Sequence, residues 1–101
     1  MAVVAVLLSL HLPGVTSLKE KRAVVRSLVE RLRSRLNVAA AEVGLQDELQ
    51  RAEIGFATVS EELATARRLA EEARRFADDE LLGKGEVIGT EIDEFVLDSA
   101  R

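Results

Sequence analysis

The stretch of residues 2–36, AVVAVLLSLHLPGVTSLKEKRAVVRSLVERLRSRL, decides the fold. Residues 2–12 alternate between two largely apolar faces, which is typical of a central strand covered on both sides. A Pro-Gly pair then breaks the strand. Ser17 and Glu20 have the spacing of a capping box, in which the serine hydroxyl accepts from the third helical amide and the glutamate reaches back to the cap amide. The stretch therefore predicts a strand, a turn and a helix that ends near Leu36.

The predicted helix is amphipathic. At about 100° per residue, one side collects its apolar side chains, namely Leu18, Val25, Leu28, Val29, Leu32 and Leu36. Basic side chains line one flank of this stripe: Lys19, Arg22, Arg26 and Arg33. Arg31 and Arg35 lie on the other flank.

The remaining chain repeats the alternation of strands and helices. Residues 37–45 (NVAAAEVGL) and 52–59 (AEIGFATV) predict two strands, and the short polar connection between them favours an antiparallel hairpin. Ser60 is the predicted cap of a second helix, with Glu61 and Glu62 in its first turn. That helix ends at Gly83 and Gly85, and residues 86–97 (EVIGTEIDEFVL) predict a last strand.

The resulting order is β-α-β-β-α-β. With right-handed crossovers it predicts an α+β, ferredoxin-like split β-α-β sandwich, in which two helices cover one face of a four-stranded antiparallel sheet. Its 101 residues correspond to a single domain, residues 1–101.

The second face of this sheet is also apolar, because the first strand has apolar residues on both sides. One layer of helices leaves such a face uncovered, and a contiguous apolar patch on a globular protein usually marks an interface. We therefore expect a homo-oligomer, with a twofold dimer favoured because isologous contacts are the commonest.

Composition excludes several kinds of chemistry. The chain has no Cys, which excludes disulfides, zinc fingers, iron–sulfur sites and cysteine nucleophiles. Its one histidine, His11, has no nucleophile paired with it in sequence. Only His11 and the acidic residues around the predicted hairpin would support an enzyme, so we expect a non-enzymatic protein with no cofactor and no metal.

Two functions known for this fold are disfavoured by missing residues. RNA-recognition domains stack bases on sheet aromatics, whereas here only Phe56 lies on a predicted central strand and the chain has no Tyr or Trp. Acylphosphatase-type enzymes need an arginine in the loop after the first strand and an asparagine on the third, and both are absent. The loop 13–17 retains the features of an anion site at a helix N-terminus, although Ser17 and Glu20 are explained equally well as caps.

Charge is distributed unevenly. The net charge is −4, which argues against a general nucleic-acid binder, and we expect no DNA partner. Residues 17–36 nevertheless carry a net +5. The sequence therefore predicts that Lys19, Arg22, Arg26 and Arg33 contact phosphates of structured RNA or a ribosomal particle, assisted by Lys21 and the helix N-terminus. The alternatives are a merely solvated basic helix, or an interaction or small-ligand module that uses the apolar sheet face.

The N-terminal apolar run is too short to cross a bilayer and has no basic region before it. We therefore expect a cytoplasmic protein without a membrane partner. The scarcity of Asn, Gln, Met and Cys also hints at a thermophilic host.

Two longer strings carry a family resemblance. HLPGVTSLKEKRAVVRSLVERLRSRLNV (11–38) and AAAEVGLQDELQRAEIGFATVS (39–60) resemble the YlxP-like family of small bacterial proteins of unknown function. The chain departs from that family at Glu48-Leu49, where an aromatic residue often follows the acidic turn residue. The resemblance implies a ferredoxin-like fold, no established activity and no catalytic residues. Family genes often lie beside those of translation initiation and ribosome-maturation factors, which implies by association a role near RNA or the ribosome.

Overall fold

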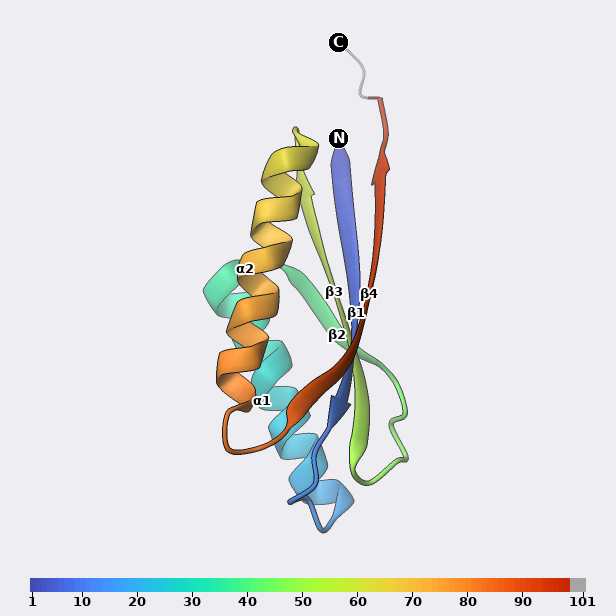
Figure 1. The fold of residues 1–101 in the computed structure, drawn as a ribbon, viewed down its shortest axis with the longest axis vertical. Coiled ribbons are helices and arrows are strands. Elements are labelled where there is room, and N and C mark those ends of the chain that lie inside the picture. The colour runs from blue at the N-terminus through green and yellow to red at the C-terminus, as the bar shows by residue number, and fades with distance from the viewer. Residues whose placement is uncertain (99–101) are drawn as a thin grey trace.

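The computed structural model describes residues 1–98 and contains two helices and one sheet (Figure 1). The elements in chain order are β1 (Ala2–His11), α1 (Leu18–Leu36), β2 (Ala39–Gly44), β3 (Arg51–Ser60), α2 (Leu63–Leu81) and β4 (Glu86–Val96). The four strands form one sheet in the order β2-β3-β1-β4, and every neighbouring pair is antiparallel. Both helices lie on the same face of this sheet. The ferredoxin-like prediction is confirmed.

β1 lies in the interior of the sheet and pairs along its whole length with both β3 and β4. Its even-numbered residues are buried beneath the helices, whereas its odd-numbered residues are half-buried on the opposite, open face. This position explains why the strand is apolar on both sides, since neither face of a central strand is fully exposed to water.

The core lies between the sheet and the two helices. Its fully buried side chains include Leu8, Leu32 and Ile54. α2 contributes a stripe of buried alanines, Ala66, Ala70, Ala73 and Ala77, which lets the helix backbone lie close to the sheet. The buried hydroxyl of Thr58 donates to the carbonyl of Ala66 across a distance of 2.8 Å, so this polar group is satisfied inside the core.

The cap of α1 matches its prediction in one of two hydrogen bonds. The amide of Glu20 donates to the Ser17 hydroxyl at 3.1 Å, as expected. The Glu20 carboxylate, however, accepts from the Thr16 amide at 3.1 Å instead of from the cap residue's amide. The Thr16 hydroxyl also donates to it, and this bond is the main reason that the pKa of Glu20 lies below its ordinary value.

Two predicted boundaries differ by two residues from the observed ones, and sheet pairing explains one of them. Ser60 belongs to β3, opposite Ala2, so it does not cap α2. The cap position is Glu62, which makes no capping hydrogen bond through its side chain, and Glu61 and Glu62 precede the helix. Asn37 ends α1 in a left-handed conformation with φ 54°, so β2 begins two residues later than predicted.

A bidentate ion pair ties α2 to the edge strand β4. Arg67 Nε lies 2.6 Å from Glu94 Oε2, and Arg67 Nη2 lies 2.8 Å from Glu94 Oε1. The hydrogen bonds from Arg67 hold the pKa of Glu94 below its ordinary value of 4.5.

This pair predicts how Glu94→Gln changes the pH dependence of stability. A carboxyl whose pKa is lowered by folding stabilises the native state above its unfolded pKa, and this stabilisation is lost as the pH falls through the lowered pKa. The variant should therefore melt below the parent near pH 7, and the two melting temperatures should converge below pH 4.5. Thermal melts followed by circular dichroism measure this difference. A difference that stays constant across the range would contradict the assignment.

Candidate functional site

A groove of about 370 Å³ lies between α1 and β2, and three arginines of α1 line it. We call this the arginine groove; its lining residues are Arg22, Val25, Arg26, Val29, Arg33, Ala41, Glu42 and Gln46. The arginines follow one another at intervals of four and seven residues, which places them along one side of the helix. The sequence predicted this helix flank but not that β2 would form the other wall.

Within residues 1–98, the arginines of the groove, Arg22, Arg26 and Arg33, form no ion pair with a carboxylate. Arg33 Nε donates to the carbonyl of Ala40 at 2.8 Å, which anchors this side chain against β2. Three unneutralised guanidinium groups beside one cavity form a surface suited to an anion.

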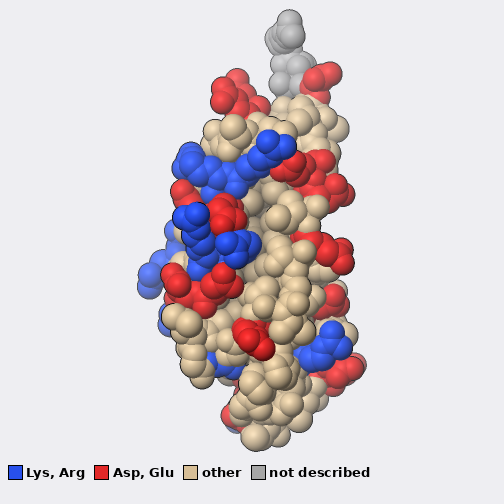
Figure 2. All heavy atoms as spheres, in the orientation of Figure 1, with Lys and Arg blue, Asp and Glu red and all other residues tan. Residues whose placement is uncertain are grey.

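The arginines of α2 are arranged differently. Arg67, Arg68, Arg74 and Arg75 each form an ion pair with Glu71, Glu72, Asp78 or Glu94. Figure 2 shows positive and negative side chains interleaved over the part of the surface where α2 lies in Figure 1. The hydrogen bond to Arg74 is also the main cause that lowers the pKa of Glu71. The basic residues of α2 are therefore neutralised within the chain, unlike those of the arginine groove.

Lys21 does not belong to the candidate site, which corrects its predicted role. Its side chain is fully buried, and its ammonium group donates to the carbonyl of Leu45 and lies 3.6 Å from Glu42 Oε2. Lys21 therefore joins α1 to the connection after β2 and presents no charge to a phosphate. Its position four residues before Val25 places it on the buried stripe of the helix, a signal that the sequence already contained.

Lys19 and the loop before α1 are separate from the groove. Lys19 is exposed near the start of the helix but is not among the residues that line the groove. In the loop, the amide and hydroxyl of Thr16 both donate to the Glu20 carboxylate. The protein's own carboxylate therefore occupies donors that an external anion would need.

The residues considered for catalysis do not assemble into a site. His11 Nδ1 lies 3.9 Å from an oxygen of the exposed Glu86 at one end of the sheet. In the predicted acidic hairpin, Glu42 pairs with Lys21. Across residues 1–98, the structure brings together no group of three His, Asp or Glu side chains able to hold a metal ion.

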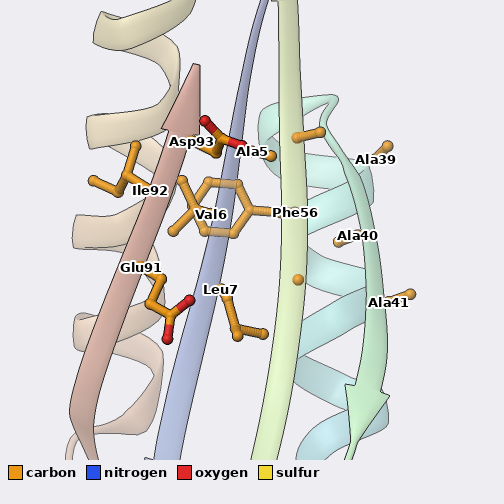
Figure 3. A pocket seen from close by; sticks show the side chains of 12 residues that line it. Ala5, Val6, Leu7, Ala39, Ala40, Ala41, Phe56, Glu91, Ile92 and Asp93 are labelled. Carbon is orange, nitrogen blue, oxygen red and sulfur yellow. The ribbon is translucent and has the colours of Figure 1, made fainter. Parts of the chain in front are cut away.

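The open face of the sheet has a hollow of about 490 Å³ at its centre (Figure 3). Small or apolar residues of three strands surround it, namely Ala5, Leu7, Ala39, Ala41, Gly55 and Ala57. Glu91 and Asp93 of β4 line one side. In Figure 3 the helices lie behind the strands, so the hollow is on the face that the helices leave uncovered.

A patch of larger apolar residues lies beside this hollow, toward the end of the sheet that carries the N-terminus. Val3 is paired with Val59 on one side and with Phe95 on the other. We call these three residues the end patch; Val59 is 58% exposed and Phe95 47% exposed. Leu97 extends the ladder by donating its amide to the carbonyl of Met1 at 2.8 Å.

Within the described residues, neither helix is apolar over enough of its length to span a bilayer.

These features define a small α+β protein of the ferredoxin-like fold with an open apolar sheet face and an arginine groove. Residues 3–92 match the model of the family described as "Protein of unknown function (DUF503)", and the chain belongs to this family. It is also similar to the uncharacterized protein YlxP of Bacillus subtilis (strain 168), with 37% identity over 62 residues. That alignment covers 61% of this chain and 67% of the Bacillus protein.

Two solved structures share the fold at low sequence identity. One is a dimeric protein of unknown function and ferredoxin-like fold from Bacteroides fragilis NCTC 9343, with a TM-score of 0.54, 14% identity and coverage of 95% of this chain and 96% of that one. The other is the Arabidopsis thaliana protein At3g17210, with a TM-score of 0.50, 16% identity and coverage of 98% of both chains. At this level of identity the similarity concerns the fold alone.

The buried position of Lys21 predicts a stability defect for Lys21→Met. Methionine keeps an apolar stem but leaves the Leu45 carbonyl and the Glu42 carboxylate without the ammonium group. We expect the free energy of unfolding in urea to fall by about 1–3 kcal/mol. Arg22→Met, at the next and exposed position, is the matched control and should change it by no more than about 0.5 kcal/mol. Equal stability of both variants would contradict the structural role of Lys21.

Proposed function

We propose that this protein is a non-enzymatic homodimeric binding module whose arginine groove takes backbone phosphates of structured RNA or of a ribosomal particle. The observation that carries the proposal is the absence of carboxylate partners for Arg22, Arg26 and Arg33 among residues 1–98. Lys19, exposed one turn before Arg22, lies on the same helix flank but outside the groove.

The chemistry of the groove favours phosphate over an isolated carboxylate. Guanidinium groups bind phosphate oxygens through paired N–H donors and keep their charge at any physiological pH. A row of such groups along a helix is better matched by a polyanion than by one small anion, because each phosphate along a nucleic-acid strand supplies a new partner. The net charge of −4 weakens any unspecific attraction, so binding depends on the groove itself.

Sedimentation with ribosomal subunits and with total RNA, over a range of salt concentrations, tests this proposal. Three phosphate contacts should give a slope of roughly −2 to −3 for the logarithm of affinity against the logarithm of salt concentration. The triple substitution Arg22→Glu, Arg26→Glu and Arg33→Glu should abolish the association while the circular dichroism spectrum stays that of the parent.

The matched control reverses three arginines outside the groove: Arg35→Glu, Arg68→Glu and Arg75→Glu. These side chains are exposed, and the change in net charge is the same. The control should retain most of the affinity. Equal losses in both triple variants would show a general charge effect, and binding unaffected by the groove substitutions would refute the assignment.

The open face of the sheet supports the homodimer in this proposal. Its hollow and end patch form a largely apolar surface, bordered on β4 by Glu91 and Asp93, that the helices leave uncovered, and large apolar surfaces usually mark interfaces. A protein with the same fold is described as dimeric, which supports the same assembly.

Ala57→Glu should convert the dimer into a monomer, because this position lies in the hollow and the carboxylate would be buried without a partner. We expect the dimer to weaken more than about 100-fold, since each 1.4 kcal/mol of cost is tenfold in affinity. Equilibrium sedimentation measures this change, with Ser34→Glu on the exposed side of α1 as the control. A parent protein that sediments as a monomer would refute the dimer.

A further inference from the structure

We propose that Glu42 makes the arginine groove selective for ribose over deoxyribose, because its carboxylate accepts a hydrogen bond from a 2′-hydroxyl of the bound strand. The ligand class is then RNA and not nucleic acid in general. This selectivity deepens the proposed function and rests on it. It gives the groove a residue that determines specificity, in addition to the arginines that bind phosphate.

The two walls of the groove have opposite hydrogen-bonding character. The wall formed by α1 carries Arg22, Arg26 and Arg33, whose guanidinium groups only donate. The opposite wall, formed by β2 and the connection after it, carries Glu42 and Gln46. An ionised carboxylate only accepts, whereas a glutamine side chain both donates and accepts. A ligand that fills the groove therefore needs acceptors toward α1 and a donor toward Glu42.

The carboxylate of Glu42 keeps its capacity to accept hydrogen bonds. Its side chain is 23% exposed, and Oε2 lies 3.6 Å from Lys21 Nζ, which is too far for a hydrogen bond. None of the side-chain hydrogen bonds within residues 1–98 ends on Glu42. The carboxylate therefore lines the groove as an acceptor that the protein itself does not occupy.

Lys21 holds this carboxylate in place from below. Its ammonium group is fully buried and also donates to the carbonyl of Leu45, so it ties Glu42 and the connection after β2 to α1. Because Lys21 has no exposed surface, it does not compete with Glu42 for a ligand in the groove. A carboxylate that is already positioned loses little conformational freedom when it binds.

Glu42 lies along the path of any strand that follows the arginines. Arg33 contacts β2 at the carbonyl of Ala40, and Lys21 contacts the connection at Leu45. Glu42 lies between these two contacts in the sequence, so α1 and β2 run past each other in opposite directions. A strand that reaches arginines at both ends of the row therefore passes Glu42.

A carboxylate inside a phosphate-binding groove repels its ligand unless the ligand offers it a donor. Like charges repel strongly where a partly buried site lowers the effective dielectric constant. The backbone of DNA has only acceptors, so nothing offsets this repulsion. Each ribose of RNA carries a 2′-hydroxyl, which can donate. The RNA backbone thus matches both walls of the groove, whereas the DNA backbone matches only the arginine wall.

Chemically modified RNA tests this selectivity on the native chain. The probes are an RNA hairpin and the same hairpin with fluorine in place of each 2′-hydroxyl, which keeps the phosphates and the A-form helix but removes the ribose donors. The protein should bind the unmodified hairpin about 10- to 100-fold more tightly, the usual range for a hydrogen bond to a charged group. Fluorescence anisotropy at one fixed salt concentration measures both affinities.

Variants show whether Glu42 causes the preference. Glu42→Met removes the acceptor and should make the two affinities nearly equal. Because it leaves the buried ammonium without a carboxylate, the double variant Lys21→Met/Glu42→Met, which retains neither charge, is the second test and should give the same result. The matched control is Asp47→Asn, which removes one negative charge at an exposed position outside the groove and should keep the preference of the parent.

Each other outcome has a defined meaning. Equal affinity of the parent for both probes would overturn the selectivity and leave the phosphate contacts in place. A preference that survives in both Glu42 variants, or one that is also lost in Asp47→Asn, would show that Glu42 is not its cause, with the same result. No affinity of the parent for either hairpin would instead overturn the proposed function itself, because any A-form hairpin offers backbone phosphates.

Discussion

The pairing of β1 on both sides is the constraint on which the rest of the structure depends. This strand forms a full-length antiparallel ladder with β3 and with β4, so every other strand is placed relative to it directly or through β3. Two helices cover its even-numbered side chains. Its odd-numbered side chains, including Val3, Ala5 and Leu7, remain on the open face and make that face apolar. The same strand therefore produces the core and the surface to which we assign self-association.

The two helices use their arginines for different purposes. On α2, arginines and carboxylates alternate at three- and four-residue intervals and neutralise each other within the helix or across to β4. On α1, acidic residues are scarce, and the groove arginines face β2, where the carboxylate that lines the groove, Glu42, is paired with Lys21. The two helices therefore differ in net positive charge for two reasons. α1 has more basic residues, and its groove arginines also have fewer carboxylates nearby with which to pair.

The sequence was sufficient for the element order, the sheet and the existence of a basic flank, because alternation and helical periodicity carry that information locally. It misplaced the start of α2, since Ser60 is held by pairing with Ala2, a residue far away in the chain. Lys21 was assigned to the surface from its charge, although its spacing from Val25 and Leu28 matched the buried stripe. The second wall of the groove depends on where β2 lies beside α1, and no pattern within either segment specifies that contact.

β4 leaves one side of its ladder unpaired at the edge of the sheet. Its exposed apolar side chains, among them Ile88, Ile92 and Val96, would make such an edge a template for adding further strands without limit. Carboxylates are interspersed with them along the strand, at Glu86, Glu91 and Asp93. Two β4 strands brought side by side would repel each other, which disfavours growth into fibrils. Much of the negative charge of this chain thus protects a long apolar edge from open-ended aggregation.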